Sequence, residues 1–294
     1  MFDYNNAFNR NIGILTEEEQ LKIKNTKVAI AGLGGIGGSI FLCLVRIGFE
    51  NFHLADLDEF DQANSNRQVG ATTKTYGQHK AEVMKQMGLD INPNLQAKVF
   101  VDGVNEENVD EFLSGRDFAL DCIDYFCLNA RCLLQNEAEK RKITTFFAAP
   151  IGMSASILCF SPDSMSFNQY FNLKDEDSKF TKILKFTVGI VPKALHSKYV
   201  DFSRERIVQM KTGPSISSAV NLAVGMIATE IISYSSGKRK PLLAPRSHQF
   251  DAFRHKYGKA NLVFGNAGPL QKIKLWLAQR IYKESADVFE EFVK

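Results

Sequence analysis

Cysteine is scarce in this sequence, and its spacing fits neither a metal site nor a redox motif. No two cysteines are separated by two residues, which excludes a zinc ribbon and a dithiol redox centre. The histidines show no metal-ligand spacing either. The cysteines are Cys43, Cys122, Cys127, Cys132 and Cys159. We therefore expect buried, reduced thiols and no structural zinc.

Long apolar runs and a strong net charge are also lacking. No run is long enough to span a bilayer, and the first residues show no secretory signal. The net charge of the 294-residue chain is only +3, which argues against DNA as a partner and weakly disfavours tRNA. Hydrophobic residues make up 45% of the chain, as in proteins with a large core. These features predict a globular, cytoplasmic protein without a transmembrane segment.

A strand, a glycine turn and the start of a helix follow one another between residues 27 and 37. Val28 to Ala31 is an apolar run of strand length. Gly32, Gly34 and Gly37 fit G-x-G-x-x-G, and Gly35 is an additional glycine. Such glycines permit a tight turn, let a ligand approach the backbone and let the helix pack on the strand. The free N–H groups at the helix start attract phosphate, so the stretch favours a nucleotide site over a turn without a ligand.

Polar side chains follow the next predicted strands. The strand at 51–55 ends at Asp56, whose carboxylate can accept hydrogen bonds from ribose hydroxyls. A guanidinium and an ammonium close together can clamp a triphosphate, and a carboxylate at a strand end suits Mg²⁺. The chain supplies these groups as Asp58, Asn64, Arg67, Gln68, Lys80 and Asp124. Together they favour attack of a carboxylate on the α-phosphate of ATP, which yields an acyl-adenylate and pyrophosphate.

Strands and helices alternate over residues 27–149, which predicts an α/β fold with a Rossmann-like, mostly parallel sheet and helices on both faces. After Pro150 the rhythm changes, so we expect an antiparallel or irregular C-terminal half. Residues 163–212 show little periodicity. They are expected to form either a substrate-facing segment or a segment that leaves the sheet and packs on the same domain. Residues 214–234 predict a long apolar helix. From Pro269 onward a basic amphipathic helix is expected, which could lie on a membrane, bind a partner or dock on its own domain.

These patterns divide the chain into four parts. Thr16 and Glu19 have capping-box spacing, so a short helix is predicted to end the first part. The predicted parts are an N-terminal arm and helix (1–26), an ATP-binding adenylation core (27–160), a substrate-facing and dimerisation segment of the same domain (161–254) and a C-terminal amphipathic helical tail (255–294).

At these motifs the chain resembles the ThiF/MoeB/HesA enzymes, bacterial relatives of the ubiquitin-activating enzymes. The resemblance rests on Phe8-Asn-Arg10, Gly32-Leu-Gly-Gly-Ile-Gly37, Asp56-Leu-Asp58, Asn64-x-x-Arg67-Gln68, Gly77-Gln-His-Lys80 and Asp121-Cys-Ile-Asp124.

The resemblance implies a role for each site residue. Asp56 would hold the ribose, and Asp124 would bind Mg²⁺. The phosphates would be held by Asn64, Arg67 and Lys80, with Gln68 supporting the loop. The resemblance further implies a homodimer in which Arg10 reaches into the ATP site of the partner.

The chain departs from the family pattern at several positions. Tyr125 replaces the usual Asn after Asp124, and the usual arginine is replaced by Asn129, with Arg131 two residues further on. No cysteine follows Cys159, so a downstream thioester-forming cysteine has no candidate.

We therefore expect an enzyme that adenylates a carboxylate and has no downstream catalytic cysteine. The carboxylate would belong to a ubiquitin-like sulfur carrier, a peptide or a carboxylated tRNA base. Two alternatives stay open. The glycines and Asp56 alone would also suit an NAD-binding oxidoreductase, and the departures at Tyr125 and Asn129 would suit a catalytically silent binding subunit.

Overall fold

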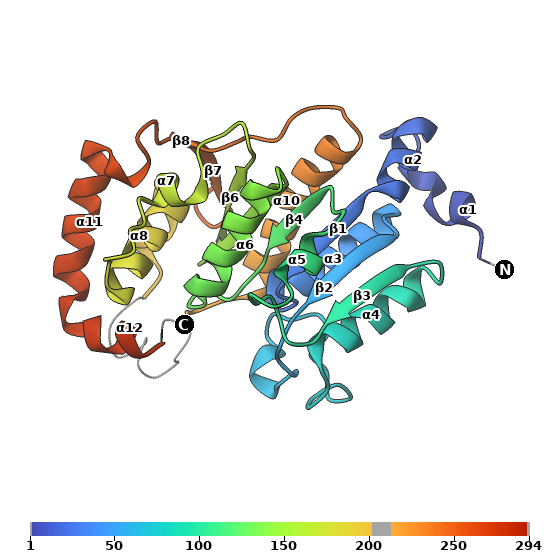
Figure 1. The fold of residues 1–294 in the computed structure, drawn as a ribbon, viewed down its shortest axis with the longest axis horizontal. Coiled ribbons are helices and arrows are strands. Elements are labelled where there is room, and N and C mark those ends of the chain that lie inside the picture. Colours follow the sequence, from blue (N-terminus) through green and yellow to red (C-terminus); the bar gives the residue numbers. More distant parts are fainter. Residues whose placement is uncertain (1, 202–212, 293–294) are drawn as a thin grey trace.

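The computed structural model describes residues 2–201 and 213–292. Its centre is an eight-stranded sheet of order β3-β2-β1-β4-β5-β6-β7-β8 (Figure 1). The pairings among β1 to β5 are parallel, and those from β5 to β8 are antiparallel. The strands are β1 (Lys27–Ala31), β2 (Asn51–Ala55), β3 (Gln96–Phe100), β4 (Phe118–Asp121), β5 (Thr144–Ile151), β6 (Ser154–Phe160), β7 (Arg246–Asp251) and β8 (Lys256–Asn261). The predicted α/β fold with an antiparallel C-terminal extension is confirmed.

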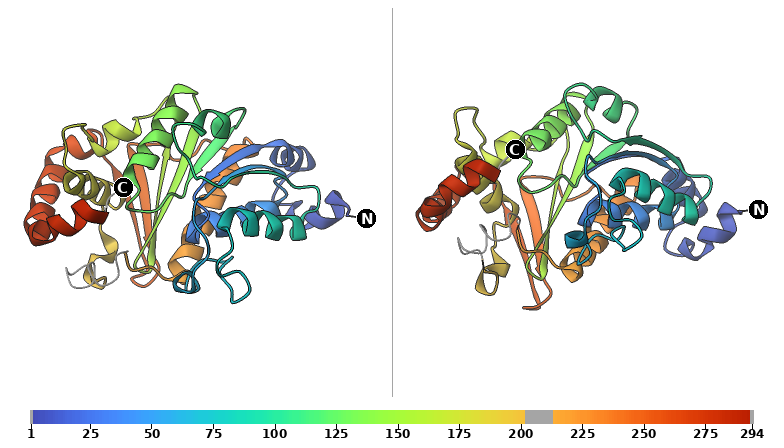
Figure 2. Two further views of the ribbon diagram at one scale, coloured as in Figure 1. Left: turned by 60° about the horizontal axis from the view of Figure 1, so that its bottom comes forward. Right: turned by 90° about the horizontal axis from the view of Figure 1, so that it is seen from below.

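Helices cover both faces of this sheet (Figures 1 and 2). One face carries α3 (Gly35–Ile47), α4 (Lys80–Ile91) and α10 (Ser217–Ser235), whose apolar side chains share one core with β1 and β4. The other face carries α5 (Val109–Leu113) and α6 (Leu128–Lys140). The remaining segments are α1 (Tyr4–Phe8), η1 (Asn9–Asn11), α2 (Glu17–Asn25), η2 (Gln62–Asn64), α7 (Phe167–Phe171), α8 (Lys179–Ile190), η3 (Leu195–Lys198), η4 (Gly265–Ala267), α11 (Pro269–Tyr282), η5 (Lys283–Ser285) and α12 (Ala286–Phe292).

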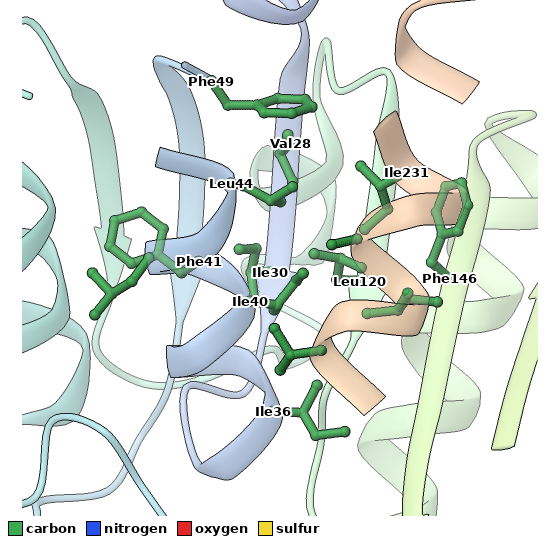
Figure 3. Packing of buried hydrophobic residues seen from close by; sticks show 14 of the residues in the cluster. Val28, Ile30, Ile36, Ile40, Phe41, Leu44, Phe49, Leu120, Phe146 and Ile231 are labelled. Atoms are coloured by element: carbon green, nitrogen blue, oxygen red, sulfur yellow. The ribbon is translucent and has the colours of Figure 1, made fainter. Parts of the chain in front are cut away.

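The main core lies between α3, α10 and the sheet. Figure 3 shows Leu44 of α3 beside Val28 of β1 and Ile40 of α3 beside Ile30 of β1. Ile231 of α10 approaches Phe146 of β5 in the same view. These side chains are fully buried, and each large apolar side chain removed from water contributes about 1.5–3 kcal/mol. The core therefore fixes α3, and with it the glycine turn at its start, against the carboxyl end of β1.

A second, aromatic core lies beyond β6. It joins Phe160 of β6 to Phe167 and Phe171 of α7 and to Phe186 of α8. The sequence predicts little periodicity for residues 163–212, yet α7 and α8 are amphipathic helices. α7 is too short, at five residues, for a helical period to be visible. The part of that segment from 202 to 212 lies outside the described residues.

The two ends of the chain hold further predicted features. Thr16 caps α2 by accepting the Glu19 N–H, and Glu19 accepts the Thr16 N–H, so the predicted capping box is confirmed. Within the segment expected to be a helical tail, β8 occupies Lys256–Asn261, and the helices begin only at Gly265. In the part of the chain that the structure describes, no helix has the length and apolar character needed to cross a membrane.

Candidate nucleotide site

The glycine turn lies where the strand order reverses. The chain leaves β1 toward β2 and β3 on one side, then returns to β4 on the other side. Gly32 adopts a φ of +89°, and its N–H donates to the Ala55 carbonyl over 2.7 Å. A Cβ atom on Gly32 would lie 2.3 Å from the carbonyl oxygen of Cys122, just after β4. Ligands of open α/β sheets bind at such a switch point, beyond the carboxyl ends of the strands.

Each remaining glycine of the motif has a close neighbour. A Cβ on Gly37 would lie 1.7 Å from the Gly32 carbonyl oxygen, so only glycine lets the turn close against the helix. Cβ atoms on Gly34 and Gly35 would lie 3.5 Å from Gln68 Nε2 and 3.6 Å from the Arg67 carbonyl oxygen, respectively. The polar loop that contains Arg67 and Gln68 therefore lies against the glycine turn.

Asp56 fastens the glycine turn to the end of β2. Its Oδ2 accepts the Leu33 N–H over 2.5 Å, and its Oδ1 accepts the Asp58 N–H over 2.9 Å. Burial raises the pKa of this carboxyl, while the Lys80 cation and the two N–H groups oppose that rise. Each carboxylate oxygen keeps a second lone pair, which can accept a ribose hydroxyl.

Lys80 is the first residue of α4, and its side chain is only 6% exposed. Its Nζ donates to Asp58 Oδ2 over 2.9 Å, and the Asp58 side chain is 59% exposed. Lysine is seldom buried this far unless it is paired. An ammonium has three N–H donors, so two remain for another anion. The ion pair thus holds a cation near the start of α4, close enough to Asp56 to act on its carboxylate as well.

The loop after β2 brings an amide and a guanidinium to the same place. Gln68 is 7% exposed, and its Oε1 is buried without a hydrogen-bond partner among the described residues. The Arg67 guanidinium donates to the Ala63 carbonyl over 3.1 Å and to Asn66 Oδ1 over 2.9 Å. Asn64 Oδ1 accepts the Asp61 N–H, which closes a capping box around η2. The Gln68 amide is therefore buried between this loop and the glycine turn.

Asp124 is exposed three residues beyond the end of β4. Its Oδ1 accepts the Phe126 N–H over 3.0 Å, while Oδ2 has no hydrogen bond to the residues that the structure describes. Arg131 fixes this loop from beneath. Its NH1 donates to the Asp124 carbonyl over 3.2 Å, and its NH2 donates to the Ile123 carbonyl. The carboxylate is therefore presented on a braced loop beside Cys122 and the glycine turn.

Arg131 is a residue whose role the sequence did not reveal. It is 1% exposed, and its Nε donates to both oxygens of Asp121 over 3.1 and 3.0 Å. Gln135 Nε2 donates to the same carboxylate over 2.9 Å, and the guanidinium lies 4.6 Å from the centre of the Phe186 ring. The available signal was the pair Arg131 and Gln135, four residues apart on α6 and facing a carboxylate at a strand end.

Tyr125, which replaces the usual Asn after Asp124, is also packed into the protein. The Tyr125 hydroxyl is hydrogen-bonded to Thr187 of α8, and its ring contacts Phe126 and Phe186. Burial raises the pKa of Tyr125 to about 12, so the phenol stays protonated at neutral pH. Tyr125 and Arg131 therefore join the end of β4 to the aromatic core.

Arg10 lies apart from these groups. It is exposed in η1, and the arm that carries it is tied to the C-terminal end of α3. Asn11 Nδ2 donates to the Ile47 carbonyl over 2.9 Å, and the Tyr4 hydroxyl donates to the Gly48 carbonyl over 2.8 Å. The thirteen residues of α3 separate this end from the glycine turn by about 20 Å. A role for Arg10 at an ATP site would thus concern the site of a second copy.

The donors at the site fit a phosphate-bound Mg²⁺ better than a metal caged by protein. Among residues 2–201 and 213–292, no group of three or more His, Cys, Asp or Glu side chains is placed to hold a metal. Mg²⁺ is commonly held by one or two carboxylates together with substrate phosphates and water. The open oxygen of Asp124 can serve in that way.

Four of the five cysteines are poor candidates for an activated nucleophile. None is in a disulfide. Burial raises the pKa of Cys43, Cys122, Cys132 and Cys159, which keeps these four as thiols.

Comparison with known proteins gives matches over most of the chain. The ThiF family matches residues 8–266. The tRNA threonylcarbamoyladenosine dehydratase of Haemophilus influenzae is 27% identical over 227 residues, which cover 76% of this chain and 86% of that protein. The enzyme of the same name from Bacillus subtilis is 34% identical over 137 residues, 46% of this chain and 53% of that protein. This match thus spans about half of the relative's length.

Solved structures extend the likeness in fold. Escherichia coli MccB superposes with a TM-score of 0.68 at 19% identity, over 90% of this chain and 72% of that chain. PaaA superposes with a TM-score of 0.66 at 18% identity, over 88% of this chain and 73% of that chain. At this identity the likeness concerns the fold.

Proposed function

The chain belongs to the ThiF family, and we propose that it is an ATP-dependent adenylyltransferase that activates a carboxylate. The observation that carries the proposal is the set of groups gathered at the switch point of the sheet. A glycine turn, a buried lysine and a buried unpaired amide oxygen lie on one side, and an exposed carboxylate on a braced loop lies on the other. Two solved structures of MccB contain ATP or its analogue AMPCPP, which supports a nucleotide as the ligand of this fold.

Each group has a place in the proposed reaction. The N–H groups at the start of α3 and the side chains of Arg67 and Lys80 hold the triphosphate, and Asp56 accepts the ribose hydroxyls. Mg²⁺, when bound at Asp124, supplies further positive charge to the phosphates. An acceptor carboxylate oxygen then attacks the α-phosphorus, the bond to the β-phosphate oxygen breaks, and pyrophosphate leaves. The protein contributes position and charge neutralisation, and no proton needs to move.

We propose a peptide or the C-terminus of a small ubiquitin-like protein as the acceptor. One solved structure of MccB contains both the nucleotide analogue AMPCPP and the peptide MccA, which supports a peptide. Four of the five cysteines have a raised pKa and are poor nucleophiles. In our proposal the acyl-adenylate passes to a group outside this chain.

A second candidate acceptor is a carboxylate on a tRNA base. It is favoured by the dehydratase of Haemophilus influenzae, because that match covers 86% of the relative. The threonylcarbamoyl group named there carries a carboxylate. Adenylation followed by attack from within the same group would release AMP and amount to a loss of water.

Pyrophosphate exchange into ATP tests the proposal. The protein is incubated with Mg²⁺, labelled pyrophosphate and one acceptor at a time: a ubiquitin-like protein ending in Gly-Gly, a peptide with a free C-terminus, or tRNA that contains threonylcarbamoyladenosine. We expect exchange with one acceptor class and its loss in Asp124→Ala, while Asp163→Ala, which removes an exposed aspartate outside the site, keeps it.

Three outcomes would contradict parts of the proposal. Exchange that survives Asp124→Ala would remove the role of this carboxylate. Normal ATP binding without exchange for any acceptor would favour a catalytically silent subunit. NADH binding can be measured by energy transfer from the protein's fluorescence to NADH. Binding that ATP does not displace would favour the oxidoreductase.

A further inference from the structure

A strip of exposed apolar side chains runs along α11. The strip consists of Leu270, Ile273, Trp276, Leu277 and Ile281, which are 45–70% exposed. Since successive residues of an α-helix are rotated by about 100°, these side chains share an arc of about 140°. They extend over about 17 Å of the helix. We call this strip the outer face of α11.

The opposite side of α11 is docked on the protein. Gln271 is 2% exposed and donates to the Val188 carbonyl of α8 and to Asn266 Oδ1. Lys274 Nζ donates to the Pro192 carbonyl. The helix is therefore held in place by one side while its apolar outer face stays exposed. In Figures 1 and 2 the helix lies at the outer edge of the molecule, at the end opposite the N-terminal arm.

Within α11 itself the charged side chains are all basic, and the first acidic residue after it is Glu284 in η5. Lys272, Arg280 and Lys283 are exposed, and the Arg280 guanidinium lies 4.3 Å from the centre of the Trp276 ring. Burial lowers the pKa of Lys274, and repulsion from the nearby Lys193 lowers it further. Residues 269–283 contain no acidic side chain. The margin of the outer face is therefore strongly cationic.

We propose that the outer face of α11 binds in the plane of an anionic membrane surface. A helix with a wide apolar face, cationic margins and a tryptophan has the composition that inserts between lipid headgroups and acyl chains. The tryptophan ring suits that boundary because it combines an apolar body with one N–H donor. A second copy fits less well, because a symmetric contact between two outer faces would bring cations toward cations.

The chain carries its own probe for this binding, because Trp276 is its only tryptophan. The full chain is titrated with vesicles of phosphatidylcholine alone, or of equal parts phosphatidylcholine and phosphatidylglycerol. We expect a blue shift of the tryptophan emission and co-sedimentation with the mixed vesicles. Raising the salt concentration should weaken the binding, because the cationic part of the attraction is screened. Light scattering without vesicles reports self-association.

Matched variants locate the contact. Ile273→Asp should lower the partition coefficient at least tenfold, since it removes an apolar side chain and adds an anion. Ile14→Asp makes the same change at a residue that is 78% exposed on the N-terminal arm, and it should leave binding unchanged. The proposal is overturned by an unshifted emission with mixed vesicles, by equal effects of the two variants, or by a dimer that Ile273→Asp dissociates. The last result would assign the outer face to a second copy.

Discussion

Replacing Lys80 by methionine distinguishes a contribution of its ammonium group to catalysis from a contribution to stability. Methionine keeps the length and apolar stem of the side chain, so the packing around the start of α4 should persist. The lost ion pair has one largely exposed partner, because the Asp58 side chain is 59% exposed. Such pairs contribute at most about 1 kcal/mol to stability. We therefore expect the free energy of unfolding to fall by no more than about 1 kcal/mol.

The effect on catalysis should be much larger. In the proposed reaction the ammonium stabilises negative charge that builds up on the triphosphate. Removing one preorganised donor of this kind costs about 2.7–4 kcal/mol in the transition state. Lys80→Met should therefore lower pyrophosphate exchange by about 10²–10³-fold, with a smaller rise in the dissociation constant for ATP.

The matched control is Lys98→Met, because Lys98 forms an ion pair with Glu111 far from the glycine turn. Its exchange rate should equal that of the unmodified chain. Exchange measured together with urea unfolding decides the matter. An exchange rate within tenfold of the unmodified chain would refute the catalytic role of Lys80. Unfolding at the level expected of a core deletion would show that the lysine serves the fold.

Three further results are expected. Mixing Arg10→Ala with Asp124→Ala should restore up to about a quarter of the exchange rate if Arg10 acts in the site of a partner, since each mixed dimer would have one complete site. Absence of activity in mixed dimers would contradict that role. Because the folded pKa of Asp56 is raised, the buried charge weakens the fold above the ordinary carboxyl pKa. As the pH rises from the ordinary carboxyl pKa to the raised pKa of folded Asp56, Asp56→Asn should therefore gain stability relative to the unmodified chain. Parallel pH profiles of the two proteins in urea unfolding would contradict this expectation. Arg131→Met should cost about 3–5 kcal/mol in urea unfolding because it leaves the buried Asp121 carboxylate without its opposite charge, and adding Asp121→Asn should recover part of this loss. Equal losses in the single and double variants would show that the buried charge is not the cause.

The nucleotide half of the site was predictable because its signals are local. The turn between β1 and α3 needs glycine at fixed positions, and Gly37 can be nothing else beside the Gly32 carbonyl. Asp56 follows β2 directly, so its place at the carboxyl edge of the sheet comes from the strand alone. The parallel sheet brings these segments together once the alternation of strand and helix is recognised.

The missed strands show where hydrophobic patterning fails. The buried face of β7 is polar, since Ser247, Gln249 and Asp251 are all at most 2% exposed. Gln249 donates to Ser154 Oγ, and Asp251 accepts the Tyr199 hydroxyl over 2.9 Å. A strand that buries hydrogen-bonded polar side chains has no apolar alternation to reveal it. The turn to β8 includes His255 with a φ of +51°, in place of the glycine that would signal a hairpin.

The loops that frame the candidate site after β2 and β4 depend on contacts that no local pattern encodes. Arg131 reaches back ten residues to Asp121, and the Tyr125 hydroxyl meets Thr187 after a separation of 62 residues. Asn66 Nδ2 donates to the Ser215 carbonyl across 149 residues, while its Oδ1 accepts from Arg67. The loop that would hold the triphosphate is thereby joined to the segment that leads into α10. A short motif therefore predicts the glycine turn and Asp56 from the sequence, whereas the bracing of the neighbouring loops comes from long-range packing that the sequence does not display.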